Sequence, residues 1–154
     1  TASSDSLSAF EYATTLPTKT SLEPGTSVSL AATMPPVHDS AVASVKPRAR
    51  HVSRTISDTL RSGDLVSRLD GDEFLIILRG VHHLRGAIRV ANKIRVAVED
   101  PIQTGFGEHI QTTSVGVTLI SGGEGIDEVL ERAEGAMRGV QQAGGNAVQS
   151  NPPI

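Results

Sequence analysis

The sequence predicts an α/β sandwich in which helices flank a mixed, mostly antiparallel sheet. Three observations support this fold class: a hairpin pattern over residues 65–78, three stretches with helical spacing of apolar residues, and strand-like runs between those helices. The order helix, hairpin, helix, strand, helix, strand lets the helices cover the sheet. With 154 residues, the chain is long enough for one domain with a real hydrophobic core.

The first part of the chain has little periodicity. Residues 1–25 are rich in Ser, Thr and Pro, which predicts a loose leader with a short helix around Leu7 to Ala13. Residues 27–32 alternate weakly and predict the first strand, bounded by Pro24-Gly25 and Pro35-Pro36. The folded domain is therefore expected to begin near residue 26.

An amphipathic helix is predicted from Arg48 to Arg61. Its apolar residues recur every four positions, at Val52, Ile56 and Leu60. Gly63 lies just past the predicted end, where glycine suits a helix cap because it adopts positive φ readily.

A β-hairpin with an acidic tip follows this helix. Apolar runs at 65–69 and 74–78 are separated by Asp70-Gly71, and Asp-Gly between two apolar runs is a strong hairpin signal because both residues tolerate positive φ. Asp72 and Glu73 add two carboxylates to that of Asp70 at the predicted tip. Such a cluster either binds a divalent cation or is solvated, and the residues alone leave both interpretations open.

The rest of the chain alternates between helix and strand patterns. A second helix is predicted over residues 84–98, where an apolar stripe runs until Pro101. Residues 109–121 alternate as a strand, residues 126–140 form a third helical stripe, and Ala147-Val148 predicts a short final strand.

The composition narrows the classes of function. A formal net charge of −3 and a pI near 5.9 argue against a dedicated nucleic-acid surface, which needs an excess of basic residues. The chain has no Cys, so disulfides and thiolate metal ligands are excluded. No apolar run approaches the roughly 18 residues of a membrane span, so we expect no membrane contact by this segment and a cytoplasmic location. Because the chain begins with Thr, we expect it to be a segment of a longer protein.

Three motifs resemble one known family. The stretch from Arg68 to Phe74 reads RLDGDEF and resembles the signature hairpin of the GGDEF family, the diguanylate cyclases, with Asp70 in place of the first Gly. Ser114 to Val117 resembles a later strand of that family, and Ala133 to Asn146 resembles its last helix. The resemblance covers roughly residues 48–149 and implies a ferredoxin-like, palm-type sandwich similar to that of adenylyl cyclases.

The resemblance also implies a domain organisation. Residues 26–150 would form the GGDEF-like domain, in which the first strand and helix region, residues 26–47, is divergent. Residues 1–25 would be the leader and residues 151–154 a linker. Covalently linked sensor and phosphodiesterase domains are possible neighbours.

The parts that a cyclase needs are incomplete in this sequence. In the family, two metal ions bridge the GTP triphosphate and activate a ribose hydroxyl, so two carboxylate sources face each other. Asp72 matches one source, but the other would fall within residues 29–34, which contain no acid. Of the guanine-reading residues only Asp39 remains, and Gln141 and Gly145 stand where the family has its phosphate-binding Lys and Arg.

These losses imply that the domain is not an active cyclase. The signature residues would be a remnant without catalytic function: Asp70, Gly71, Asp72, Glu73 and Phe74. No cofactor is expected, and Asp72 is a weak candidate for Mg²⁺ only if some GTP binding persists.

A second site of the family matches this chain. Many GGDEF domains have Arg-x-x-Asp just upstream of the signature, where the product cyclic di-GMP binds and inhibits, and Arg61 and Asp64 fit that pattern and distance. The resemblance also suggests Lys93 as a further basic residue of this site, with Arg89 and Arg95 as alternatives. Outside this context the same pattern would be a surface ion pair of under about 1 kcal/mol.

Three functions are therefore open. The first is a cyclic di-GMP receptor, possibly a homodimer bridged by a stacked dinucleotide. The second is a diguanylate cyclase with residual activity, which converts two GTP molecules into cyclic di-GMP. The third is a module that binds no nucleotide and serves as a dimerisation or control surface for a neighbouring phosphodiesterase domain.

Overall fold

The computed structural model describes residues 26–34, 45–70, 72–105 and 107–151. In chain order its elements are β1 (Thr26–Met34), α2 (Val45–Thr59), β2 (Leu65–Asp70), β3 (Glu73–Arg79), α3 (Leu84–Val98), β4 (Ile102–Thr104), β5 (Gly107–His109), β6 (Thr112–Leu119), α4 (Ile126–Gln142) and β7 (Val148–Ser150). The predicted leader with its short helix, and Asp39, lie outside the described residues.

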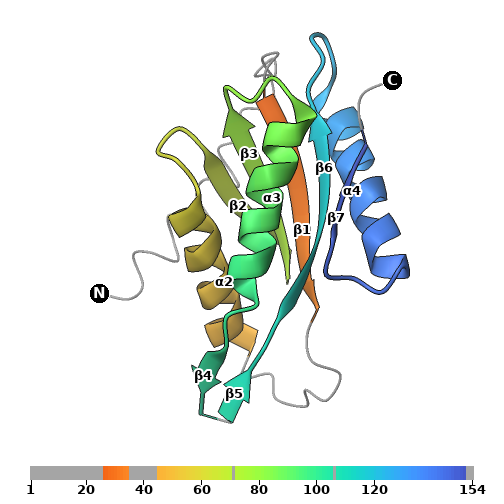
Figure 1. The fold of residues 1–154 in the computed structure, drawn as a ribbon. Coiled ribbons are helices and arrows are strands. Elements are labelled where there is room, and N and C mark those ends of the chain that lie inside the picture. The colour runs from red at the N-terminus through yellow and green to blue at the C-terminus, as the bar shows by residue number, and fades with distance from the viewer. Residues whose placement is uncertain (1–25, 35–44, 71, 106, 152–154) are drawn as a thin grey trace.

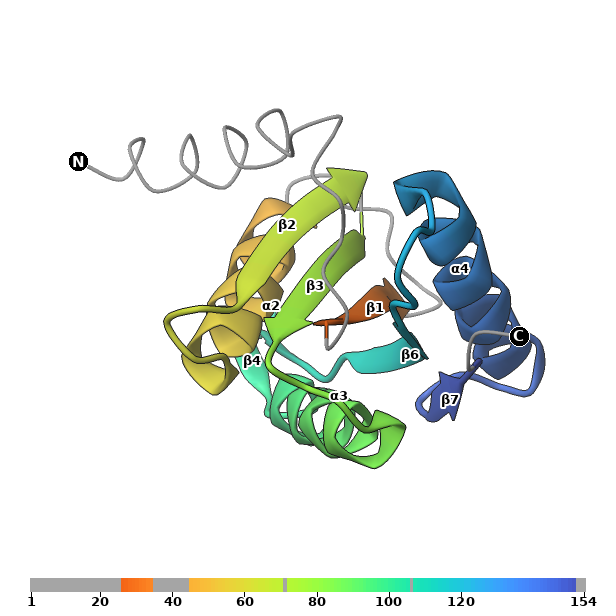
Figure 2. The same ribbon diagram turned by 90° about the horizontal axis from the view of Figure 1, so that it is seen from above.

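A five-stranded sheet forms the centre of the domain, in the order β2-β3-β1-β6-β7. β1 is the middle strand and pairs antiparallel with both β3 and β6, whereas β6 and β7 pair in parallel. Helices α2 and α3 cover one face of the sheet and α4 covers the other (Figures 1 and 2). The predicted fold class, a mixed and mostly antiparallel sheet flanked by helices, is confirmed. Within the described part of the chain, no helix is long and apolar enough to cross a membrane.

The predicted helices are present, and both boundaries of α2 are shifted. α3 spans Leu84–Val98, as predicted. α2 begins earlier and ends at Thr59, so Arg61 lies in the connection to β2 and not in the helix. The amide of Leu60 donates to the carbonyl of Ser57 at 3.2 Å, and this tighter bond closes the last turn.

The strand predicted over residues 109–121 is present as β6, but it is shorter than predicted. The chain first forms the short hairpin of β4 and β5, and β6 starts only at Thr112. Strands of three residues are too short to show alternation, which is why this hairpin was missed. Gly107 begins β5 with φ of 108°, a conformation that other residues rarely adopt.

The turn of the β2–β3 hairpin lies one residue later than predicted. β2 and β3 pair regularly from Leu65 to Arg68, but the register then shifts and Asp70 pairs with Glu73. Leu69 is the extra residue of this bulge, and two residues opposite one is the arrangement that defines a β-bulge. Asp70 is therefore a paired strand residue and not part of the turn predicted at Asp70-Gly71.

Alternation along the strands divides the core between the two faces of the sheet. Phe74, Ile76 and Leu78 pack with residues of α2 and α3, and Leu75 and Ile77 pack with residues of α4. All five side chains of this run are buried, so β3 supplies apolar surface to both layers. The hairpin is thereby held at a fixed position in the sheet.

α4 contacts the sheet at backbone distance. A Cβ atom at Gly116 in β6 would lie 2.1 Å from the carbonyl oxygen of Ala133 and 2.4 Å from the amide nitrogen of Met137. Only a residue without a side chain fits there, because both neighbours are backbone atoms of α4. The end of α4 turns through Gly144, Gly145 and Asn146, all with positive φ.

A largely buried ion pair fastens the loop before α4. Arg132 binds both carboxylate oxygens of Glu124 and also donates to the Thr118 hydroxyl and the Leu119 carbonyl, each at 2.9 Å. Glu124 in turn accepts from the Ser121 amide at 2.7 Å. The hydrogen bond from Arg132 is the main reason that the pKa of Glu124 is lowered.

Candidate functional site

The two motifs singled out from the sequence lie at opposite ends of the β2–β3 hairpin. The signature lies where β2 ends and β3 begins, and Arg61 and Asp64 lie where the chain enters β2. Arg79 ends β3 on the side of Arg61, about 20 Å from the turn at a strand rise of about 3.3 Å per residue. The structure therefore separates the signature from the Arg-x-x-Asp motif.

The signature end exposes one well-described carboxylate. Asp72 is exposed, Glu73 is half-buried and Phe74 is a core residue with 1% exposure. Asp70 occupies the last position of β2, and Gly71 lies outside the described residues. Of the five signature residues, Asp72 is thus the one whose described side chain faces solvent most freely.

The strand beside the signature contributes no acid. β1 runs next to β3, with Ala31 opposite Phe74 and Ala32 opposite Glu73. All nine residues of β1 are uncharged. In the part of the chain that the structure describes, no three His, Asp or Glu side chains come close enough to hold a metal ion.

Two uncharged residues, Gln141 and Gly145, stand where the family has its phosphate-binding Lys and Arg. Gln141 lies half-buried in the last turn of α4, and Gly145 follows with φ of 79°. The adjacent Asn146 accepts a hydrogen bond from Arg95 of α3 at 3.1 Å. Arg95 also pairs with Glu99 at 3.0 Å, so this alternative to Lys93 already holds the loop after α4 against α3.

At the other end of the hairpin, Asp64 joins two segments of the backbone. Its Oδ2 accepts from the amide of Arg61 at 3.0 Å, and its Oδ1 accepts from the amide of Arg79 at 3.2 Å. The side chain of Asp64 is only 4% exposed. This carboxylate therefore ties the end of β3 to the loop that follows α2.

Arg61 closes the same junction from outside. Its Nη2 donates to the carbonyl of Arg79 at 3.2 Å, and its Nε lies 3.6 Å from Oδ2 of Asp64. Even so, the Arg61 side chain is 70% exposed. A guanidinium has five N–H donors, so most of its donors are open to a ligand.

The roles expected of Arg61 and Asp64 toward guanine stay predictions, but their geometry differs. Arg61 presents its guanidinium to solvent, as a ligand contact requires. Asp64 has one backbone amide on each oxygen and little exposed surface, so contact with a guanine edge would need the remaining lone pairs of a nearly covered carboxylate.

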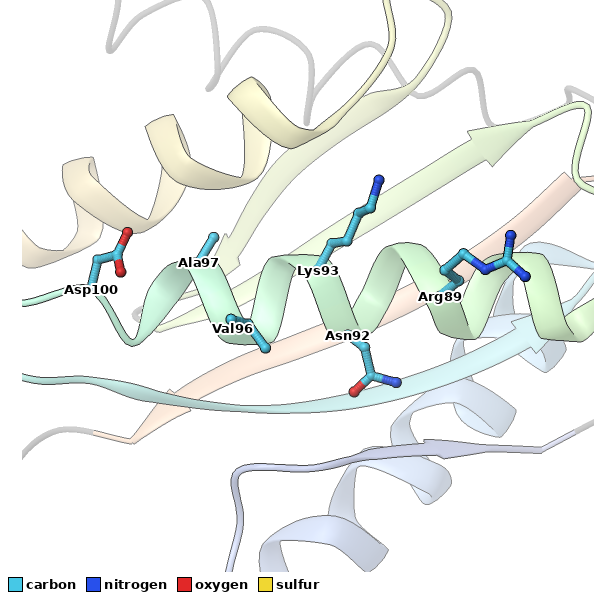
Figure 3. A pocket seen from close by; sticks show the side chains of 6 residues that line it. All are labelled: Arg89, Asn92, Lys93, Val96, Ala97 and Asp100. Carbon is cyan, nitrogen blue, oxygen red and sulfur yellow. The ribbon is translucent and has the colours of Figure 1, made fainter.

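Lys93, the third residue predicted for this site, belongs to α3. It lies on the outer side of α3 in a shallow hollow lined by Arg89, Asn92, Lys93, Val96, Ala97 and Asp100 (Figure 3). In Figure 3, Lys93 points toward the side of α2 and Asn92 toward the side of β7. Lys93 is about 13 Å along the helix from its start, at about 1.5 Å per residue. No hydrogen bond or ion pair between described residues joins it to Arg61 or Asp64.

The domain resembles solved GGDEF structures. The GGDEF domain of YfiN (TpbB) from Pseudomonas aeruginosa matches with a TM-score of 0.75 at 21% identity, covering 84% of this chain and 83% of that one. An EAL/GGDEF domain protein from M. capsulatus matches at 0.74 and 26% identity, covering 96% and 94%. DgcB from Caulobacter crescentus, solved in complex with c-di-GMP, matches at 0.72 and 19% identity, covering 82% and 69%. The fold is therefore that of a GGDEF domain.

The sequence comparisons agree with the fold. The family described as diguanylate cyclase, GGDEF domain, matches residues 49–147, more than half of the chain. The diguanylate cyclase DgcM of Escherichia coli (strain K12) is 35% identical over 97 residues, which is 63% of this chain and 23% of that protein. This chain belongs to the GGDEF family of diguanylate cyclases. It spans less than a quarter of the length of DgcM.

Proposed function

We propose that this domain is a cyclic di-GMP receptor that binds its ligand at the Arg61–Asp64 junction and does not synthesise it. The observation that carries the proposal is the state of Arg61, whose side chain is 70% exposed although its amide and guanidinium are both held at the junction. The solved complex of DgcB with c-di-GMP provides one example of a protein with this fold that binds this ligand.

The chemistry of an exposed, anchored arginine suits a guanine nucleotide. A guanidinium donates two parallel hydrogen bonds to the O6 and N7 atoms of guanine or to the oxygens of a phosphate. Because Arg61 is already anchored to the Arg79 carbonyl, less side-chain entropy remains to be lost when a ligand binds. This preorganisation of Arg61 should therefore increase the affinity for the nucleotide.

The other end of the hairpin supports the absence of synthesis. A two-metal cyclase needs carboxylates from two elements around its ions. Here the strand beside the signature offers Ala31 and Ala32 where an acid would have to stand. Asp72 alone is a poor site for Mg²⁺, so we propose no metal cofactor unless residual GTP binding brings one.

A ligand-bridged homodimer belongs to the same proposal. In a dimer bridged by a stacked dinucleotide, Lys93 of one copy would also meet a ligand held by Arg61 of the second copy. Its hollow on α3 is open, which suits a bridging contact (Figure 3).

The receptor would act within a longer protein. The chain covers 23% of DgcM, so further domains are expected beside it. We propose that a linked sensor or phosphodiesterase domain receives the signal in the cytoplasm, where guanine nucleotides are made.

Calorimetric titration of cyclic di-GMP tests the proposal directly. The wild-type domain should bind it with micromolar or tighter affinity and should give no comparable heat with GTP and Mg²⁺. Arg61→Ala should lower the affinity by about 10- to 100-fold, the loss expected for one charge-assisted contact. Arg54→Ala is the matched control, because Arg54 is an exposed arginine of α2 for which the structure shows no ion pair among the described residues.

Two outcomes would count against the receptor. If neither cyclic di-GMP nor GTP gave a binding heat, the domain would be left as a dimerisation or control surface. Equal losses in Arg61→Ala and Arg54→Ala would show that binding depends on general positive charge and not on the junction.

A further inference from the structure

One column of exposed residues on α3 has a distinct order of charges. This α3 column consists of Arg89, Lys93, Val96 and Asp100, which recur at helical spacing and border the shallow hollow on the helix (Figure 3). All four are exposed, and Val96 is exposed to 58%. Among the described residues, none of the four side chains has a hydrogen bond or ion pair. Along the chain, the order of the column is positive, positive, apolar, negative.

An exposed column on α4 has the opposite order of charges. This α4 column consists of Asp127, Glu131, Gly135 and Arg138, at nearly the same spacing. Its order is negative, negative, small, positive, and Arg138 pairs with Glu134 on its own helix. A Cβ atom at Gly135 would have nothing within 4 Å, although glycine is unfavourable inside a helix. Packing within the domain therefore does not explain this glycine.

The two columns match when the helices lie side by side and run in the same direction. The two cations of the α3 column then face the two acids of the α4 column. Val96 meets the open surface at Gly135, and Asp100 lies beside Arg138. Charges arranged in this way attract each other and also fix the register of the contact.

The fold prevents this contact within one copy but permits it between two. α3 and α4 cover opposite faces of the sheet (Figure 2). Because β3 and β6 both pair antiparallel with β1, they run in one direction, and α3 and α4 both return alongside them (Figure 1). A second copy in the same orientation, moved across the sheet, therefore brings its α4 parallel to α3 of the first.

We propose that a second copy of this chain docks its α4 column on the α3 column. Each copy has both columns, so the contact can repeat and form an open stack. An anionic membrane would also attract the cations of α3, but it would repel Asp100 and would leave the exposed Gly135 unexplained. The contact requires no nucleotide and is separate from the proposed receptor function. Because two helices make a small interface, the association should be weak and reversible.

Sedimentation velocity of the whole chain without nucleotide tests the proposal. At low salt, the wild type should associate as its concentration rises. At about 1 M salt, where the Debye length is about 3 Å, it should sediment as a monomer. Lys93→Glu and Glu131→Lys each place like charges opposite each other, so each variant alone should associate about tenfold more weakly or less. Both positions are exposed, so the melting temperatures should not change.

A mixture of the two variants gives the sharpest result. Glu at position 93 of one variant then faces Lys at position 131 of the other, and the remaining contact has the wild-type residues on both sides. The mixture should therefore associate like the wild type at low salt. Arg54→Glu is the control, because it changes an exposed charge of α2 outside both columns and should leave association unchanged.

Several outcomes would overturn the proposal. One is a wild type that stays monomeric at low salt, and another is a mixture that associates no better than its two components. An equal loss in Arg54→Glu would show that only the overall charge matters. If the wild type stayed monomeric but bound phosphatidylserine vesicles, and Lys93→Glu did not, the α3 column would face a membrane and not a second copy.

Discussion

The two ends of the β2–β3 hairpin contain similar sequences, Asp70-Gly71-Asp72 at the turn and Gly63-Asp64 at the entry, but their carboxylates have opposite environments. At the turn, Asp72 is exposed beside a strand without acids. At the entry, Asp64 is nearly covered and accepts two backbone amides. The entry is thus the end of the hairpin where a carboxylate is held in place by the backbone, which supports the proposal that the ligand binds there and not at the turn.

The largest predicted difference between the two ends is the absence of GTP turnover at the turn. A missing electrostatic element of a transition state costs about 2.7–4 kcal/mol, and a lost phosphate contact about 1.5–3 kcal/mol. One absent acid source and two absent cations should together cost on the order of 6 kcal/mol, or about four decades in rate. We therefore expect no cyclic di-GMP above background when the domain is incubated with GTP and Mg²⁺ and the products are separated by chromatography.

The control adds one carboxylate back to the strand beside the turn. Ala32→Asp places an acid opposite Glu73, but Gln141 and Gly145 still stand in the cationic positions. This variant should also be inactive. Robust synthesis of cyclic di-GMP by either protein would show that the turn is catalytically active, so the two ends of the hairpin would no longer differ in this way.

A substitution in the centre of the sheet should affect both ends together. A methyl group at Gly116 would meet backbone atoms of α4 at 2.1 and 2.4 Å, so α4 must move away from β6. Overpacking of a core costs about 1–3 kcal/mol and sometimes more, and the backbone contact places Gly116→Ala at the upper end. Thermal unfolding followed by circular dichroism should show a large fall in melting temperature.

Gly135→Ala provides the matched control within α4. A Cβ atom at Gly135 has nothing within 4 Å, and alanine is about 1 kcal/mol better than glycine inside a helix. This variant should be as stable as the wild type or more so. Equal destabilisation by both substitutions would mean that α4 does not rest on Gly116.

The smallest effect compares the two carboxylates themselves. Asp64→Ala removes the partner of two amides and should lower the free energy of unfolding by about 1.5–3 kcal/mol. Asp72→Ala removes an exposed group and should change it by within about 0.5 kcal/mol. Urea unfolding of both variants measures the difference. A cost at Asp72 as large as that at Asp64 would show hidden structure at the turn.

The sequence predicted the fold well because apolar periodicity is local. The stripe of α3 and the apolar runs of β2 and β3 depend on neighbouring residues only, and each element was found at nearly its observed position. The bulge at Leu69 was missed, since it depends on how two strands match in register. The β4–β5 hairpin was missed because its strands are too short for a period to appear.

The candidate site was only partly predictable for the same reason. Arg61 and Asp64 are three positions apart and form a recognisable motif. The bonds that give them different roles run to Arg79, fifteen positions beyond Asp64. A polar residue at the end of an apolar strand was the one sequence signal for Arg79, and it does not show that the backbone of Arg79 bonds to both motif residues.

The bonds of Asp64 also have a consequence for motion. One carboxylate restrains the amides of Arg61 and Arg79, so both are released when this side chain leaves its place. In hydrogen exchange the two amides should open as one cooperative unit although they belong to separate segments. A ligand that binds Arg61 would then slow hydrogen exchange at the amide of Arg79. Binding at the loop after α2 would in this way stabilise the end of β3 in the central sheet.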